Sequence, residues 1–198
     1  MSALPDMAMR SLDSAWDRAR WGALPRDGNR YEVIGGVLYM STSPSAFHQW
    51  IVGQIYTELR AQLDGPGVAS TFLAPLGVFM PGCDPVQPDL IVVRREDLGI
   101  VRARVEGVPA LLVEVLSPSN AGTDTDVKRR AYARTGVPGY GIVRPAQRDM
   151  LLYSQPDRAL GDYTQTTHVD RDGEVASPTL PFRVPVASFF ADAPSTEL

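Results

Sequence analysis

Two short apolar runs constrain the fold of this chain more than any other feature. Residues 89–93 read Asp-Leu-Ile-Val-Val, and residues 110–116 read Ala-Leu-Leu-Val-Glu-Val-Leu. Neither run alternates polar with apolar positions, which is typical of strands buried on both faces. Helices must cover such strands from either side, and a chain of 198 residues is long enough to supply them within one domain.

Helical periodicity indicates which segments provide that cover. Apolar side chains recur every four residues from Phe47 to Leu63, and Ser45 precedes them as a candidate N-cap. Residues 123–135 begin among Thr and Asp residues and are followed by Gly136, which predicts a second helix. A third helix is predicted over residues 7–21, where apolar side chains recur at helical spacing, namely Met9, Leu12, Trp16 and Ala19.

The remaining segments favour strands and turns. Two β-rich runs within residues 31–40 flank Gly35-Gly36 and predict a hairpin, since a Gly-Gly loop tolerates the positive φ angles of a tight turn. Strands are also predicted at 68–80, interrupted by Pro75, and at 140–143 and 150–153, with further hairpin structure over 161–183 and a short helix at 186–190. The expected fold is α/β, with a mixed central β-sheet flanked by helices, an N-terminal helix and added hairpins, in a single domain over residues 1–198.

Two carboxylates stand where apolar residues are expected. Asp89 opens one buried strand directly after Pro88, and Glu114 lies inside the other between Val113 and Val115. A buried carboxylate is costly unless it is paired, hydrogen-bonded or bound to a metal. One interpretation is a Mg²⁺ site, in which the cation polarises a phosphoryl oxygen and activates water. The alternative is a structural ion pair of Glu114 with Lys128 or Arg129.

The order of several motifs resembles the Uma2 family, which has the restriction-endonuclease-like fold. The matching stretches cover residues 30–40, 43–45 with His48, 86–93, 111–119 and 126–140. The resemblance extends from Arg30 to Pro145, which is the expected core of the domain. It implies a nuclease of the PD-(D/E)xK type that cuts DNA with Mg²⁺, or alternatively Mn²⁺, and it favours a homodimer.

The resemblance also implies a role for individual residues. Pro88-Asp89 corresponds to the "PD" of the nuclease signature, and Glu114 corresponds to the second acid. The signature lysine would normally follow two residues later, where this chain has Leu116; the Uma2 pattern places it on the next helix, which makes it Lys128. Glu32 corresponds to an acid that is brought to the metal from outside the central strands. The metal ligands would then be Asp89, Glu114 and Glu32, with Lys128 as a further catalytic residue.

Lys128 can be placed on its helix from spacing alone. Residues 124, 128 and 131 share a face, and Ala131 is small and apolar, so this face is expected to pack on the sheet. Lys128 should therefore reach inward towards the end of the strand that carries Glu114. His48 matches a position of the family on the preceding helix, where a role in packing is the alternative to one in the site. Beyond the expected metal ligands, Gly139-Tyr140-Gly141 and Arg144-Pro145 depart from the Uma2 pattern.

Composition limits the partners and the compartment. The net charge of −4 excludes a nucleic-acid grip over the whole surface, so contact with DNA must be local. Cys83 is the single cysteine, and the two histidines, His48 and His168, lack the paired spacing of a zinc cluster. No apolar stretch resembles a signal peptide or a membrane span, so a cytoplasmic protein without membrane contact is expected.

Three functions remain after this reading. The first is an endonuclease that hydrolyses phosphodiester bonds in DNA with a metal. The second is a non-catalytic nucleic-acid-binding or regulatory module that keeps the fold, which the acidic net charge favours. The third is a structural or ligand-binding protein with an internal ion pair. The set of Asp89, Glu114 and Lys128 favours the nuclease, because a pure binding module gains nothing from buried acids that repel phosphate.

Overall fold

A mixed six-stranded sheet forms the centre of the protein. The computed structural model describes residues 9–25, 27–41, 43–117 and 122–194, so Pro118 and Ser119 of the motif at 111–119 lie outside the described residues. The strand order is β12-β11-β10-β9-β7-β4, and only β9 and β10 run parallel. Their bounds are β4 Ala69–Leu73, β7 Leu90–Arg94, β9 Leu111–Val115, β10 Gly139–Arg144, β11 Asp149–Asp157 and β12 Asp162–Val169.

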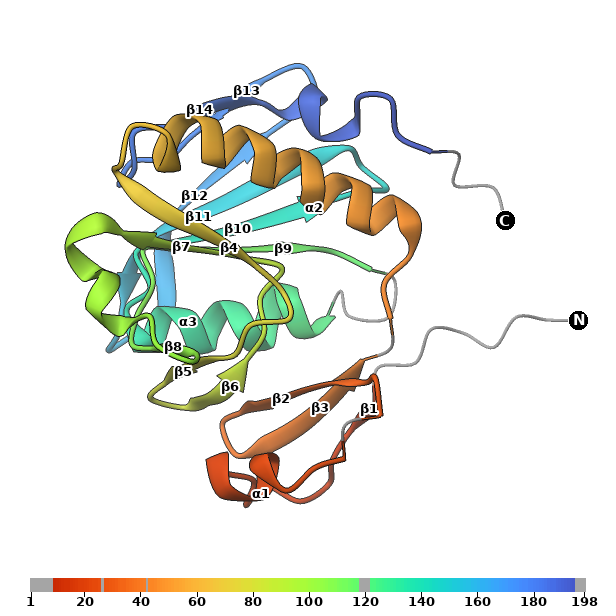
Figure 1. Ribbon diagram of the computed structural model, residues 1–198, viewed down its shortest axis with the longest axis vertical. Helices are drawn as coiled ribbons and strands as arrows, with labels where there is room; N and C mark the ends of the chain where they lie inside the picture. Colours follow the sequence, from red (N-terminus) through yellow and green to blue (C-terminus); the bar gives the residue numbers. More distant parts are fainter. Residues whose placement is uncertain (1–8, 26, 42, 118–121, 195–198) are drawn as a thin grey trace, which may run out of the picture.

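Two helices cover the two faces of this sheet (Figure 1). On one face lies α2, Ala46–Leu59, which Ser45 caps as predicted and which continues into the π-helical turn η1, Arg60–Asp64. On the other face lies the helix predicted at 123–135, which divides into the π-helical η3, Thr123–Lys128, and α3, Arg129–Thr135. Gly136 ends α3 in the left-handed conformation, with φ of 90°.

A second sheet packs below α3 in the view of Figure 1 and has the order β1-β3-β2-β6-β5-β8. The predicted hairpin is present as β2, Arg30–Ile34, and β3, Val37–Ser41, and its loop residues Gly35 and Gly36 have φ of 57° and 78°. The other strands are β1 Met9–Arg10, β5 Val78–Met80, β6 Cys83–Val86 and β8 Val105–Glu106. The prediction missed β6, β8 and the 3₁₀ helix η2, Arg95–Ile100.

The C-terminal segment closes over α2. Here β13, Glu174–Ala176, pairs with β14, Arg183–Pro185, and the predicted last helix is the 3₁₀ helix η4, Val186–Phe190. Phe182, Val184 and Phe189 from this segment pack into the same core cluster as Ile55 and Leu59 of α2. This face of the central sheet is therefore filled by apolar side chains.

The N-terminal helix predicted over residues 7–21 is wrong for most of its length. Met7 lies outside the described residues, Met9 and Arg10 form β1, and only α1, Arg18–Gly22, is helical. Side chains compete with the helix here, because Asp13 N donates to Ser11 Oγ at 2.9 Å and Ala15 N donates to Asp13 Oδ1 at 2.8 Å. Leu12, counted as part of the apolar stripe, is 99% exposed.

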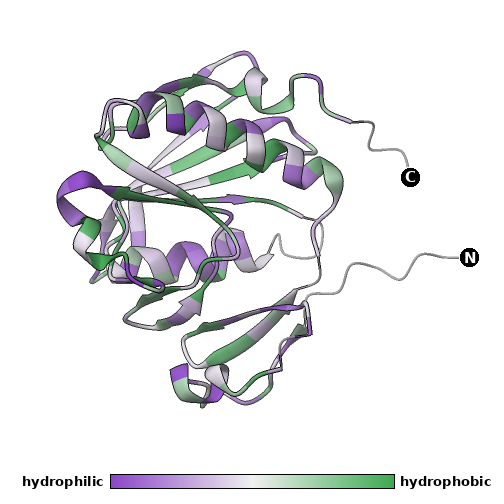
Figure 2. Cartoon of the chain, in the orientation of Figure 1, coloured by the Kyte–Doolittle hydropathy of each residue, from purple (hydrophilic) through white to green (hydrophobic). Residues whose placement is uncertain are grey.

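The alternation of side chains along the central strands sets the position of the polar groups. Leu90 and Val113 face α2, whereas Ile91 and Leu112 face α3 and the second sheet. Glu114 follows Leu112 by two residues and so points to the α3 side. Figure 2 shows the central strands as mainly hydrophobic and α3 as mainly hydrophilic. Within the residues that the structure describes, no helix is long and apolar enough to cross a membrane.

Candidate functional site

The pairing of β7 with β9 brings the two predicted strand acids together. Leu90 pairs antiparallel with Val113, so Asp89 and Glu114 occupy adjacent positions at the same end of the two strands. Both residues are buried, with exposed fractions of 3% and 1%. Asp89 Oδ2 accepts a hydrogen bond of 2.9 Å from the backbone N–H of Val115, which ties the carboxylate of one strand to the backbone of the other. The two acids therefore lie side by side on neighbouring strands.

Lys128 reaches Glu114 from the end of η3, the inward direction expected from the helical spacing. Its Nζ lies 2.8 Å from Glu114 Oε1, 3.0 Å from Glu32 Oε2 and 3.2 Å from Asp124 Oδ1. The contact with Glu114 is a hydrogen bond, whereas Asp124 Oδ1 has no hydrogen-bond partner among the described residues and faces Lys128 as an ion pair. The four residues predicted for the site are thus assembled within one cluster. Arg129, the other cation considered for an ion pair with Glu114, instead contacts Asp126 and Asp162.

Asp124 is a site residue that the sequence reasoning missed. It is buried, and it lies one helical turn before Lys128 on the same face of η3. With Glu32, Asp89 and Glu114 it makes up what we call the acid cluster. The i, i+4 spacing of Asp124 and Lys128 was the available signal, but acids near the start of a helix are ordinary because they complement the helix dipole.

Arg30 was also missed, and it lies directly against the acid cluster. Its Nη1 donates to Asp89 Oδ1 at 3.0 Å, and its Nη2 donates to Glu114 Oε2 at 3.4 Å. Arg30 precedes Glu32 by two residues on β2, so both side chains lie on the same face of the strand. Two cations, Lys128 and Arg30, therefore stand among the carboxylates of the cluster.

His48 holds Asp89 from the side of α2. Its Nε2 lies 2.9 Å from the carbonyl oxygen of Val115 and 3.2 Å from Asp89 Oδ2. Both neighbours are acceptors, so Nε2 is the nitrogen that carries hydrogen. The contact fixes the orientation of the Asp89 carboxylate, and it gives His48 a place at the site as well as in the packing of α2.

Burial and the neighbouring charges shift the pKa of two of the four acids downward and of the other two upward. Burial opposes ionisation of Asp89, but the hydrogen bond from His48 and the charge of Arg30 outweigh it and hold the pKa of Asp89 below its ordinary value. Burial likewise opposes ionisation of Glu32, whose pKa the charges of Lys128 and Arg30 nevertheless lower. For Glu114 and Asp124, burial prevails over Lys128 and raises the pKa. The pKa of Lys128 is raised because its surrounding carboxylates outweigh burial.

An open cleft reaches the cluster at Arg30. It has a volume of about 710 Å³, and its lining includes Trp21, Tyr31, Gln87 and Arg104 as well as Arg30. The guanidinium of Arg104 lies 4.8 Å from the Trp21 ring centroid, a cation–π contact. The cleft thus combines positive charge with aromatic surface beside the buried acids.

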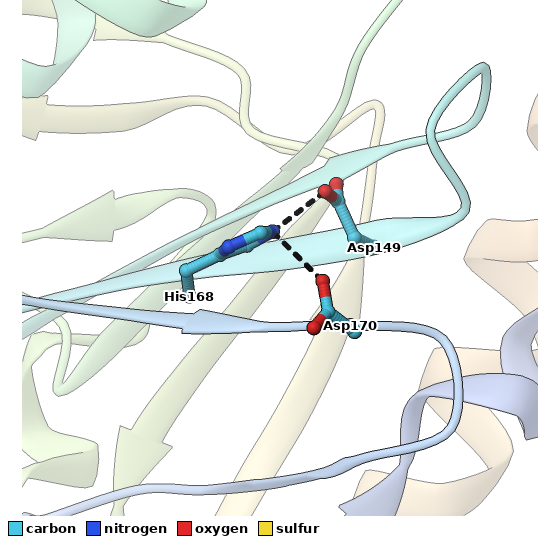
Figure 3. Close-up of side chains that lie close together, drawn as sticks. All are labelled: Asp149, His168 and Asp170. Atoms are coloured by element: carbon cyan, nitrogen blue, oxygen red, sulfur yellow. Dashed lines mark hydrogen bonds and ion pairs between the residues drawn. The ribbon is translucent and has the colours of Figure 1, made fainter.

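A second group of potential metal ligands lies on β11 and at the end of β12 (Figure 3). His168 Nε2 is 2.7 Å from Asp149 Oδ2 and 3.5 Å from Asp170 Oδ1. Strand pairing assembles this group, which is why the spacing of the histidines gave no sign of it. However, Arg144 Nε donates to Asp149 at 2.7 Å, and its Nη2 lies 3.2 Å from the same histidine nitrogen. The Arg144 guanidinium is a positive charge beside this group that disfavours a metal cation, as Lys128 and Arg30 are beside the acid cluster.

A family model identifies the family of this chain, and a solved structure shows the same fold. The Uma2 sequence model, described as "Putative restriction endonuclease", matches residues 19–187. A crystal structure of a putative nuclease belonging to DUF820, from Anabaena variabilis ATCC 29413, superposes with a TM-score of 0.75. It covers 89% of this chain and 98% of its own at 16% sequence identity, which establishes a shared fold. No curated protein matches the chain. The family match spans most of the sequence, and the protein therefore belongs to the Uma2 family of putative restriction endonucleases.

Proposed function

We propose that this protein is a metal-dependent endonuclease that hydrolyses phosphodiester bonds in DNA by a PD-(D/E)xK mechanism. One observation carries the proposal. Asp89 Oδ1 and Glu114 Oε2 come from neighbouring strands and face a common space, because both contact the same guanidinium group of Arg30. Family membership supports a nuclease function in general, and the geometry supports this particular pair of acids as its centre.

The donor set fits a hard divalent cation. The acid cluster offers carboxylate oxygens only, which suit Mg²⁺ and Mn²⁺. Its four carboxylates face two cationic side chains, Lys128 and Arg30, so full ionisation of the acids would leave an excess of negative charge for a metal to neutralise. Asp89 and Glu114 would hold the cation, with Glu32 as the third ligand. When bound, the cation would polarise a phosphoryl oxygen and lower the pKa of a coordinated water.

Lys128 and His48 have complementary roles in this proposal. Lys128 binds three carboxylates at once and so fixes the positions of Glu32 and Glu114 relative to each other. Its charge also stabilises negative charge that develops on the phosphoryl group. His48 fixes Asp89 through Nε2. The cluster is therefore ordered before the substrate arrives, which spares the cost of reorganisation during the reaction.

The cleft beside Arg30 is the proposed path for DNA. With a net charge of −4, the chain needs a local basic surface to attract a polyanion. Arg104 and Arg30 provide positive charge in the cleft, and Trp21 and Tyr31 provide aromatic groups against which a base or sugar can pack. The cleft thus supplies the local contact that the composition demands.

A cleavage assay on supercoiled plasmid tests the proposal. Wild-type protein should nick or cut the plasmid with Mg²⁺ or Mn²⁺, and a chelator should abolish the activity. Asp89→Asn, Glu114→Gln and Lys128→Ala should each lower the rate by about 100-fold or more, because each removes part of one charge-stabilising assembly. Their effects should not add, since the residues act as a unit.

Asp149→Asn is the matched control, because it neutralises an acid of the second candidate group and leaves the acid cluster intact. Its cleavage rate should equal that of wild type. Loss of activity in Asp149→Asn with normal rates in Asp89→Asn would transfer the centre to the second group. DNA binding without cleavage under any metal condition would favour the non-catalytic binding module.

A further inference from the structure

Arg30 contacts the acid cluster in a way that differs from Lys128. Its three nitrogens spread over three carboxylates, at 3.0 Å to Asp89, 3.4 Å to Glu114 and 3.9 Å to Glu32. A guanidinium built into a permanent pair usually makes two short, parallel hydrogen bonds to one carboxylate. Arg30 makes no such pair, and its buried Nε has no hydrogen-bond partner among the described residues. The fit of Arg30 to the acids is therefore loose.

On the two strand acids, Asp89 and Glu114, the oxygen atoms that Arg30 contacts are those least engaged by the rest of the protein. On Asp89, Oδ2 receives the N–H of Val115 and the contact from His48, whereas Oδ1 faces Arg30. On Glu114, Oε1 receives Lys128, whereas Oε2 faces Arg30. Asp89 and Glu114 would therefore hold a metal at the place that Arg30 occupies in this structure.

We infer that Arg30 is the resident counter-cation of the acid cluster and that a divalent metal replaces it, which moves the guanidinium into the adjacent cleft. The inference rests on the proposed metal centre. A Mg²⁺ ion requires its oxygens at about 2.0–2.1 Å, which leaves no room for a guanidinium on the same two atoms. Lys128 contacts neither of these two oxygens, since its Nζ lies against Glu114 Oε1, Glu32 Oε2 and Asp124 Oδ1.

The surroundings of Arg30 provide the second position. The side chain of Arg30 is 21% exposed, whereas that of Lys128 is 2% exposed. Arg30 also lines the 710 Å³ cleft, so a change of rotamer carries its head from the acids into open space. There it joins Arg104, and two guanidinium groups suit the binding of a substrate phosphate. Metal binding would thus both fill the catalytic site and release a phosphate-binding arginine.

Calorimetric titration with Mn²⁺ alone tests this exchange. Arg30→Met removes the competing cation and should bind Mn²⁺ about tenfold or more tightly than wild type, the equivalent of one charge-assisted hydrogen bond that no longer has to be broken. Thermal melts should show Arg30→Met destabilised relative to wild type in a chelator but not in saturating Mn²⁺. Arg104→Met, which removes an equal charge from the cleft without touching the acids, should leave the affinity within about twofold of wild type.

Competition by free guanidinium ion tests whether the metal displaces the Arg30 side chain or only responds to the changed net charge of the site. Guanidinium ion added to Arg30→Ala should weaken Mn²⁺ binding, because it refills the vacated position, and should have less effect on wild type. Arg30→Lys keeps the positive charge and replaces the neutral variants in these titrations if those fail to fold. It should bind Mn²⁺ with an affinity between those of wild type and Arg30→Met. Equal or weaker Mn²⁺ binding by the Arg30 variants would overturn the inference, whereas absence of Mn²⁺ binding in wild type as well would overturn the metal centre itself.

Discussion

Substitution of Glu114 by Gln distinguishes a cluster of carboxylates that share Lys128 from an isolated structural ion pair. In an isolated buried pair, removal of one partner leaves an uncompensated charge and costs about 3–5 kcal/mol. Here Lys128 keeps two other carboxylates, from Glu32 at 3.0 Å and Asp124 at 3.2 Å, after Glu114 is neutralised. The Gln carbonyl oxygen also remains available to accept the hydrogen bond that Lys128 now donates at 2.8 Å. The loss should therefore be small.

The burial of Glu114 supports the same conclusion. Burial raises the pKa of Glu114 despite the opposing charge of Lys128, so Gln removes a charge that burial disfavours. We expect Glu114→Gln to change the free energy of unfolding by less than about 1 kcal/mol without metal. Lys128→Met, by contrast, leaves the carboxylates without their shared ammonium and should cost about 3–5 kcal/mol.

Urea denaturation and thermal melts in a chelator measure both effects. At about 2–4 °C per kcal/mol for a chain of this size, the midpoint of Glu114→Gln should lie within about 4 °C of wild type, and that of Lys128→Met about 6–20 °C below. Equal losses in the two variants would refute the reasoning, because they would show a simple pair in which both partners are required for stability.

Two further predictions concern the scaffold. Burial opposes ionisation of Asp149, but hydrogen bonds from Arg144 and His168 outweigh it and lower the pKa of Asp149. The ionised Asp149 therefore stabilises the protein above its unfolded pKa of about 4, and this stabilisation is lost as pH falls through the folded pKa. Asp149→Asn should cost about 1–3 kcal/mol at pH 7 in urea denaturation, and a difference from wild type that persists undiminished at pH 3 would contradict this. Gly36→Ala should destabilise the protein more than Gly35→Ala. A Cβ on Gly36 would lie 2.3 Å from the carbonyl oxygen of Ser14, whereas one on Gly35 meets nothing within 4 Å. If both variants lost the same stability, about 1 kcal/mol from the positive φ alone, the contact with Ser14 would not matter.

The parts of the fold that the sequence predicted are those with strong local signals. The continuous apolar runs around residues 90 and 113 indicated strands buried on both faces. The apolar residues spaced four apart up to Leu63 indicated α2. The prediction for the N-terminal segment was wrong because Met9 and Leu12 are spaced as in a helix but are exposed. The prediction missed β6 because a proline such as Pro85 cannot donate a backbone hydrogen bond and argues against a strand.

The candidate site was predictable to the extent that its residues were out of place. Asp89 and Glu114 stood out because an acid in an apolar strand is costly. Asp124 and Arg30 did not, since an acid at a helix start and an arginine at a strand start are ordinary. Helical spacing did place Asp124 and Lys128 on one face of their helix, but no local pattern in the sequence encodes how β2, with Arg30, packs against the central sheet.

The most direct measurement is the anomalous scattering of a crystal soaked in Mn²⁺. We expect a peak between Asp89 and Glu114, on the side of Asp89 Oδ1 and Glu114 Oε2 that Arg30 now contacts, and its loss in Asp89→Asn. A peak at Asp149, His168 and Asp170 in its place, or no peak at the acid cluster in saturating Mn²⁺, would contradict the account.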